Sequence, residues 1–297
     1  MDSKQIRGII FIILSAVGYA FVAILGKWIF SNHLSMYAIM AFRFIGATLF
    51  FFFVSLWKKE PLSFREFLPL FLLGLIADGL QTSFFLIAVR EVGASITTIL
   101  LYTFPVFVLF IHRIFYKEKF TKIRFFSLMF SILGACLIIN PFVGKNTLSS
   151  LGIACGIGTA ILYAIYLTLS GKWTKNISTP LSSGYLLFGA STFFISLSLF
   201  ENSFQIPATS LEWTLIGGFI VFGTIIPLYS LVAGIKLIGV VRSTFIFTIE
   251  PIATVIFAFF LFGETLTPLK ILGSIFIFVS VVLSLLPSKS PHVIQEG

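Results

Sequence analysis

The chain has few charged residues and no long polar stretch. Only 10% of its 297 residues are Asp, Glu, Lys or Arg, whereas a soluble domain usually carries about 25%. Long apolar runs alternate with short polar connectors, and the mean hydropathy is +1.08. These features exclude an ordinary soluble fold and indicate a polytopic membrane protein.

Metal centres and nucleophilic active sites need residues that are scarce in this sequence. The two cysteines, Cys136 and Cys155, lie inside apolar runs without metal-ligand spacing, and we expect two small buried apolar side chains. The histidines fall in a connector (His33), near the end of an apolar run (His112) and in the tail (His292). We therefore expect no metal site, no cofactor and no enzyme active site.

Ten segments are long and apolar enough to cross a membrane. They are residues 6–29, 34–57, 67–89, 94–116, 123–143, 149–171, 181–200, 211–234, 239–262 and 266–286. The first segment has no clear cleavage site, so we expect a retained helix and not a signal peptide. The predicted fold class is an all-α polytopic membrane protein with ten transmembrane helices.

Basic residues are distributed unevenly between the two sides of this arrangement. The side with both termini would carry 15 of the 20 Lys and Arg residues and the other side 4, with Arg43 inside the second segment. By the positive-inside rule both termini, including a tail over 288–297, face the cytoplasm. This distribution explains the net charge of +9 without a nucleic acid partner.

The two halves of the chain resemble each other at a nearly constant distance. Seven residues recur 146 positions later: Arg90, Gly93, Thr98, Pro105, Glu118, Thr121 and Arg124 correspond to Lys236, Gly239, Thr244, Pro251, Glu264, Thr267 and Lys270. We therefore predict two five-helix repeats, residues 1–146 and 147–287. Because five is odd, the second repeat enters the membrane from the opposite side, which gives the inverted topology common among secondary transporters.

The second repeat carries the motifs Glu250-Pro251 and Gly263-Glu264, followed by Gly273. With the Arg43-Phe44 pair, this resembles the EamA-type signature of the drug/metabolite transporter superfamily. The first repeat has a degenerate match, Phe104-Pro105 and Lys117-Glu118. The resemblance implies a secondary transporter without a nucleotide-hydrolysing domain. The substrates of the family range from amino acids to nucleotide-linked metabolites, vitamins and drugs.

Two acidic residues, Asp78 and Glu250, fall near the middle of predicted spans, where a charge costs about 2.5–3.5 kcal/mol on insertion scales. Their repeat counterparts are Thr224 and Phe104, so the duplication is broken at both positions. Asp78 is a candidate for substrate binding or proton coupling; the alternative is a structural pair with Arg43 or a hydrogen bond to a neighbouring helix. Glu250 is a candidate for the same roles, or it organises the bend at Pro251.

Arg43 is the only basic residue of the sequence that falls well inside a predicted span. It could neutralise a carboxylate or phosphate of the substrate, or it could pair with Asp78. If both charges line the cavity, a zwitterion such as an amino acid would suit them.

Prolines and polar side chains inside the spans complete the candidate set. Pro105, Pro251 and Pro227 are predicted helix bends, which mark binding sites in repeat transporters, although a passive kink is the alternative. The further candidates for the cavity lining are Tyr19, Gln81, Thr98, Tyr102, Tyr163, Tyr166 and Tyr229. Tyr offers an apolar ring and a polar tip, which suits an organic ligand, and helix packing is the alternative role.

These observations predict a secondary transporter that moves a small organic metabolite, with an amino acid favoured, across a bacterial inner membrane by alternating access. The expected partners are a small-molecule substrate and membrane lipid, and a homodimer is left open. Export of drugs or other metabolites is an alternative within the same class. A passive channel or a non-transporting membrane protein is the alternative outside it.

Overall fold

The computed structural model describes residues 2–29, 35–61, 63–118, 121–139, 149–263 and 265–286, with the backbone alone for 23–29. His33, His292, Glu264 and the tail 288–297 lie outside these ranges. The helices of the first half are α1 (Ser3–Ile29), α2 (Met36–Trp57), α3 (Phe64–Leu72), η1 (Leu73–Asp78), α4 (Gly79–Leu101), α5 (Phe104–Phe115) and α6 (Lys122–Ile139). Those of the second half are α7 (Ser150–Trp173), α8 (Thr179–Phe200), α9 (Ser210–Ile220), η2 (Val221–Ile225), α10 (Ile226–Ile238), α11 (Val240–Phe247), α12 (Glu250–Phe262) and α13 (Pro268–Leu285).

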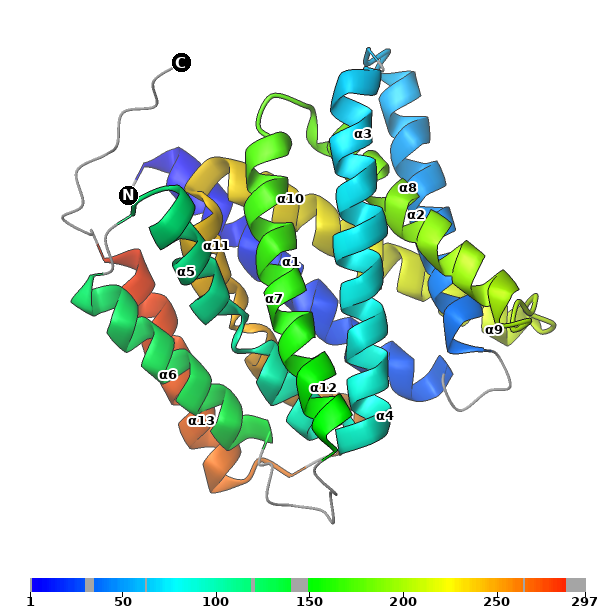
Figure 1. Ribbon diagram of the computed structural model, residues 1–297. Coiled ribbons are helices and arrows are strands. Elements are labelled where there is room, and N and C mark those ends of the chain that lie inside the picture. The colour runs from blue at the N-terminus through cyan, green and yellow to red at the C-terminus, as the bar shows by residue number, and fades with distance from the viewer. Residues whose placement is uncertain are drawn as a thin grey trace.

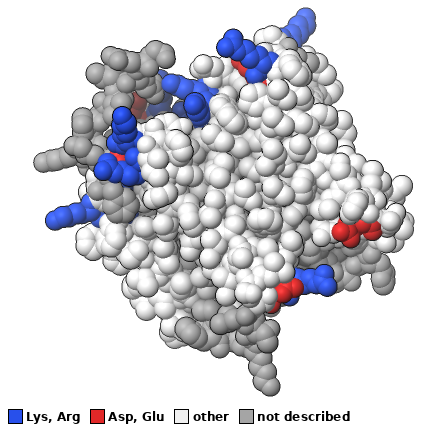
Figure 2. All heavy atoms as spheres, in the orientation of Figure 1, with Lys and Arg blue, Asp and Glu red and all other residues white. Residues whose placement is uncertain are grey.

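The predicted all-helical membrane fold is confirmed. Within the described residues, nine helical stretches are long and apolar enough to cross a membrane, and Phe104–Phe115 is a shorter apolar helix. One of the nine, Phe64–Leu101, is broken at Gly93 inside α4. Figure 2 shows one face of the molecule, on which charged side chains gather towards the two ends and the broad surface between them is uncharged. An uncharged belt of this kind is what a bilayer interior requires.

Four of the ten predicted spans are interrupted helices. The third and eighth spans each contain a π-helical turn, η1 and η2, where the backbone takes one extra residue per turn. The fourth and ninth spans are each divided into two helices, α4 and α5 in one repeat and α11 and α12 in the other. The apolar pattern could not show these interruptions because hydropathy alone does not distinguish α from π turns.

Matched glycines separate the third span from the fourth and the eighth from the ninth. Gly93 has φ 82° and Gly239 has φ 81°, and these two residues are 146 positions apart. This backbone conformation is accessible essentially to glycine alone, because a side chain would be strained there. The same chain reversal therefore occurs in both repeats. In each one, the Gly lets two consecutive spans run antiparallel without a longer loop between them.

The packing of the helices follows the inverted repeat. Four helix pairs share the most extensive contacts, and two of these join α1 to α10 and, in the equivalent arrangement, α7 to α4. The other two extensive pairings join equivalent helices to each other, α2 to α8 and α6 to α13. Figure 1 shows α6 and α13 side by side at one edge of the bundle, while α1, α4, α7 and α10 occupy its middle. The central helices are thus the ones that position a site.

Small residues hold α6 against α13. A Cβ added at Gly134 would meet the Gly273 carbonyl oxygen at 2.7 Å, and one added at Gly273 would meet the Gly134 oxygen at 2.6 Å. The Ser280 hydroxyl donates to the Ser127 carbonyl at 2.7 Å. Close backbone approach and interhelical hydrogen bonds are the usual basis of helix association in a membrane. This pair forms an edge of the bundle and contributes no residue to the cavity described below.

Candidate functional site

A cavity of about 180 Å³ lies between the two repeats in the middle of the bundle. It is lined by residues of both π-helical spans and of both divided spans. A cavity of about 150 Å³ accommodates benzene, so this one has room for a small organic molecule. Eight of the ten candidate residues line it: Tyr19, Arg43, Asp78, Gln81, Tyr102, Tyr163, Tyr166 and Glu250.

Two candidate residues lie elsewhere. Tyr229 is 36% exposed and packs edge-on against Phe11, with ring centroids 6.3 Å apart. The Thr98 hydroxyl donates to the Ala94 carbonyl one turn earlier at 2.7 Å, which satisfies it within its own helix. Neither side chain is among those that line the cavity.

The cavity is built from equivalent positions of the repeats. Four pairs of lining residues are 146 positions apart: Asp78 and Thr224, Thr82 and Leu228, Leu101 and Phe247, Phe104 and Glu250. The site therefore lies about the axis that relates the two halves. The sequence candidates did not include four of these lining residues, Thr82, Thr224, Phe104 and Phe247. The repeat offset could have identified two of them, because it pairs Thr224 with Asp78 and Phe104 with Glu250.

Asp78 is placed by the π-helical turn of the third span. It is the last residue of η1, and its carboxyl lines the cavity. Thr224 occupies the equivalent turn, η2, on the other side of the cavity. A π turn displaces the following residues around the helix, and such turns are frequent at functional sites. The two turns thus aim residues 78 and 224 at the same space.

Arg43 contacts the π-helical turn of the opposite repeat. Its Nε donates to Thr224 Oγ1 at 2.6 Å and its Nη2 to the Gly223 carbonyl at 2.9 Å. The guanidinium lies over the rings of Phe44 and Phe219, 5.1 Å and 4.8 Å from their centroids. The salt bridges between described residues do not include one from Arg43 to Asp78, and the hydrogen bonds from Nε and Nη2 of Arg43 go to η2.

Glu250 lies where the ninth span is divided. It is the first residue of α12, directly after the turn residues Thr248 and Ile249. Tyr102, at the C-terminal end of α4, interacts with the Glu250 side chain across the cavity. The division of the helix therefore supplies the position of this carboxyl.

The three prolines all stand at the starts of helices that follow an interruption. Pro105 and Pro251 lie in the first turns of α5 and α12, and Pro227 lies in the first turn of α10 after η2. A proline in a first turn removes no helical hydrogen bond, because the N–H there has no intrahelical partner. Pro105 and Pro251 therefore fix where each half-helix begins, whereas Pro227 lies inside the helical stretch Ser210–Ile238, directly after its π-helical turn.

The sequence profile of the EamA-like transporter family matches residues 6–140 and 150–286, which together cover most of the chain. The chain belongs to the EamA-like transporter family. The two matched stretches correspond to the two halves seen in the structure. The resemblance noted from Glu250-Pro251 and Arg43-Phe44 is therefore confirmed at the level of the family.

Curated relatives of this EamA-like chain are transporters. It is 24% identical over 248 residues to the uncharacterized transporter YdfC of Bacillus subtilis (82% of this chain, 78% of that protein). An uncharacterized transporter of Clostridium kluyveri is 22% identical over 310 aligned residues (98% and 96%). The pseudopaline exporter CntI of Pseudomonas aeruginosa is 23% identical over 154 residues (51% and 52%). A solved crystal structure superposes with a TM-score of 0.80 at 10% identity, over 94% of this chain and 96% of the other, which shows the shared fold.

Outside the cavity, the EamA-like chain carries a polar cluster at the end of α5. His112 Nδ1 lies 3.0 Å from Glu118 Oε1, and Arg124 Nη1 lies 2.7 Å from Glu118 Oε2. The hydrogen bond from His112 and the charge of Arg124 hold the pKa of Glu118 below its ordinary value of 4.5. Among the described residues, no group of three or more His, Cys, Asp or Glu side chains could hold a metal ion. Cys136 and Cys155 are free, and Cys155 is buried.

Proposed function

We propose that this protein is a secondary transporter that moves a small organic metabolite, an amino acid or a related compound, across a bacterial inner membrane by alternating access. The single observation that carries the proposal is the cavity between the repeats, lined by two carboxyls and a guanidinium at mid-bundle depth. Ionisable groups at that depth are costly, and in membrane proteins they mark substrate and ion pathways. Ligand sites between inverted repeats with interrupted helices are typical of secondary transporters.

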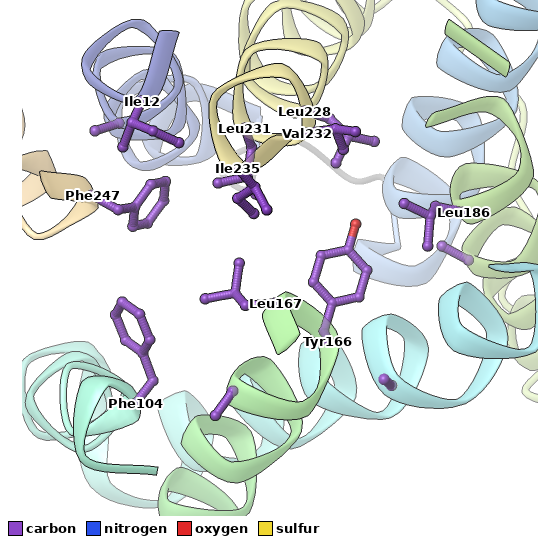
Figure 3. Packing of buried hydrophobic residues seen from close by; sticks show 14 of the residues in the cluster. Ile12, Phe104, Tyr166, Leu167, Leu186, Leu228, Leu231, Val232, Ile235 and Phe247 are labelled. Atoms are coloured by element: carbon purple, nitrogen blue, oxygen red, sulfur yellow. The ribbon is translucent and has the colours of Figure 1, made fainter. Parts of the chain in front are cut away.

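Alternating access is supported by a difference between the two ends of the cavity. At one end, Leu231 and Ile235 of α10 are 2% and 4% exposed and pack with Leu167 of α7. Figure 3 shows Ile235 and Leu167 pointing toward one another below the α10 helix. We infer that this buried apolar packing closes the cavity at the end beyond Leu228, a lining residue one turn before Leu231.

The same end is fastened by a polar contact. Lys236 Nζ donates to the Ile177 carbonyl at 2.7 Å and to Thr179 Oγ1 at 3.2 Å, which ties the end of α10 to the start of α8. The Ser178 hydroxyl donates to Glu60, which adds the connection between α2 and α3. By the positive-inside rule this end faces the cytoplasm.

The opposite end is lined by Val22 and Phe85, which belong to the cavity wall. Phe85 is the repeat counterpart of Leu231, and Arg90, the counterpart of Lys236, is exposed. We infer that the cavity opens outward in this conformation, and that exchange of the two packing arrangements between the repeats would open the cytoplasmic end instead. Inverted repeats supply two such states from one fold.

Asp78 and Glu250 are the groups that we assign to substrate binding or to a coupling proton. Each is half-buried and lines the cavity, and each has an uncharged residue at the equivalent position of the other repeat. Arg43 contacts the backbone of η2, and its role is to hold that turn in place.

The test is radiolabel uptake and counterflow in proteoliposomes that contain the full chain. The panel holds amino acids, nucleotide-linked metabolites and vitamins, each with and without a pH gradient. Accelerated exchange of one compound class supports the proposal, and loss of a gradient effect in Asp78→Asn assigns the coupling. Flux without saturation or counterflow would indicate a passive channel. No exchange of any class by folded protein would contradict the proposal.

Export is the direction that one relative favours, since the Pseudomonas aeruginosa protein matched over half of this chain is named a pseudopaline exporter. Proteoliposomes of both orientations distinguish the directions. An exporter driven by proton exchange is expected to accumulate substrate when the cytoplasmic face is outside and the lumen is the more acidic side. Accumulation in the opposite orientation alone would assign import.

A further inference from the structure

The charges that line the cavity are not balanced. Asp78 and Glu250 supply two carboxyls and Arg43 supplies one guanidinium. Three of the five guanidinium N–H groups are directed at protein atoms, Thr224 Oγ1, the Gly223 carbonyl and, more weakly, Met40 Sδ at 3.7 Å. Aromatic rings lie within about 5 Å of the guanidinium carbon. The basic group is therefore engaged by the protein. Glu250 interacts with Tyr102, but a carboxylate has about four acceptor sites, so both carboxyls keep capacity for a ligand.

Aromatic rings surround the same space. Phe104 meets Tyr163 edge-on at 4.9 Å and Phe247 at 6.3 Å, and Tyr19 meets Phe247 edge-on at 5.7 Å. All four rings line the cavity, and Phe104 is the repeat counterpart of Glu250. Aromatic faces attract organic cations, and the attraction is larger in a site from which water is excluded.

We propose that the cavity selects organic amines that carry one net positive charge, with the ammonium group held by Asp78 and Glu250 beside the aromatic rings and no carboxylate required on the ligand. Two independent observations support this selection, the surplus carboxyl and the aromatic wall. The inference rests on the proposed transport function and changes the favoured ligand from an amino acid to a related amine, because an amine, a zwitterion and a carboxylate of equal size would be treated differently.

Three small compounds that share a phenyl ring and chain length separate these cases. They are 2-phenylethylamine, phenylalanine and 3-phenylpropionate, and their binding to the purified full chain is measured by calorimetry at pH 7 in detergent. We expect the amine to bind with the highest affinity, phenylalanine roughly tenfold or more weaker, and phenylpropionate not at all. A matched change outside the cavity, Glu201→Gln, removes an exposed carboxyl and leaves all three affinities unchanged.

Variants test which groups hold the ammonium. Asp78→Asn and Glu250→Gln should each weaken amine binding by roughly 10- to 100-fold, the loss expected for one charge-assisted hydrogen bond. Thermal unfolding shows which variants fold. If one carboxamide variant does not fold, the other variant and Phe104→Leu, which removes an aromatic face and no charge, still test the site.

Several outcomes would overturn the inference. It fails if phenylpropionate binds and the amine does not, or if the amine binds equally to wild type and to both carboxamide variants. It also fails if none of the three compounds binds to the folded wild-type chain. Counterflow of an amino acid without any amine binding would leave the transporter proposal standing and remove only the amine selection, so the two failures are distinguishable.

Discussion

The two repeats share a backbone plan and differ in the residues that face the cavity. At the π-helical turns, the first repeat has Asp78 and the second has Thr224; at the divided spans, the first has Phe104 and the second has Glu250. Each repeat thus contributes one carboxyl, but from a different helix. The duplicated backbone therefore positions the site, while its chemistry comes from the positions where the duplication has been lost.

A second difference concerns packing and not composition. Residues 231–235 are all buried, whereas the equivalent residues 85–89 include Ile87 at 36% exposure and are buried only at Ala88. The same part of the repeat is therefore closed at one end of the molecule and open at the other. Two equivalent segments that pack differently in one conformation can exchange their packing in another. A transporter that alternates between two states requires this property.

The largest expected effect on transport comes from removing the charge of Asp78, which makes the two π-helical turns alike in charge. Asp78→Asn keeps the size of the side chain and removes its charge, and we expect transport to fall at least roughly 30-fold, because a desolvated charge pair with substrate or proton is lost. The equivalent change, Thr224→Val, removes a hydrogen bond from Arg43 and should lower stability by about 1 kcal/mol with little effect on transport. Initial rates and thermal unfolding of both variants are the measurements. Equal transport losses at the two positions would contradict the assigned asymmetry.

Thiol labelling tests whether residues 85–89 are more accessible than residues 231–235. In a background of Cys136→Ser and Cys155→Ser, a cysteine is placed at Phe85 or at Leu231, and its reaction with a membrane-impermeant maleimide is followed. The thiol at position 85 faces the cavity and should react at least roughly tenfold faster than the one at position 231, whose position is buried. Removing the Lys236 contact with Lys236→Met should raise the rate at position 231. Equal rates at both positions would remove the support for an outward-open state.

Much of this arrangement follows from sequence because burial in a membrane makes the pattern strong. Ten apolar segments and the repeat offset predict the helices and their inverted arrangement, and intramembrane charge marks Asp78, Glu250 and Arg43 as candidates for the cavity. The same reasoning includes Tyr229 and Thr98, since a polar tip in an apolar run does not reveal which way the side chain points. The sequence also could not predict that Arg43 donates to the Gly223 carbonyl, because no residue type indicates where a π-helical turn exposes a backbone carbonyl.

A smaller effect is expected where the two repeats agree, at the glycine that ends α10. Gly239 has φ 81° and ψ 162°, and a methyl group added there would meet nothing within 4 Å. Gly239→Ala should therefore lower stability by about 1–3 kcal/mol through backbone strain alone. The matched control, Gly217→Ala, places the same methyl in open space on helical backbone and should be neutral or stabilising by about 0.5–1 kcal/mol. Thermal unfolding midpoints compare the two, and equal midpoints would contradict the strain.

The smallest expected effect lies at the end of α5, where the repeats differ again. Glu118 accepts from His112 and Arg124, whereas the second-repeat counterpart of His112 is Ala258. The Glu118 side chain is 32% exposed, so water screens the contacts, and Glu118→Gln should cost about 0.5–1 kcal/mol at pH 7. Because these contacts lower the folded-state pKa of Glu118, its stabilisation is present above pH 4.5 and is lost as the pH falls through the folded value.

The difference in unfolding midpoint between wild type and Glu118→Gln should therefore shrink between pH 7 and pH 3.5. Glu201→Gln, at an exposed position, is the control and should show no difference at either pH. A loss of the same size at both pH values would mean that Glu118 acts through packing, and the polar contact would then not be what joins the end of α5 to the start of α6. A loss confined to neutral pH would show that the first repeat has an electrostatic tie which its counterpart at Ala258 cannot form.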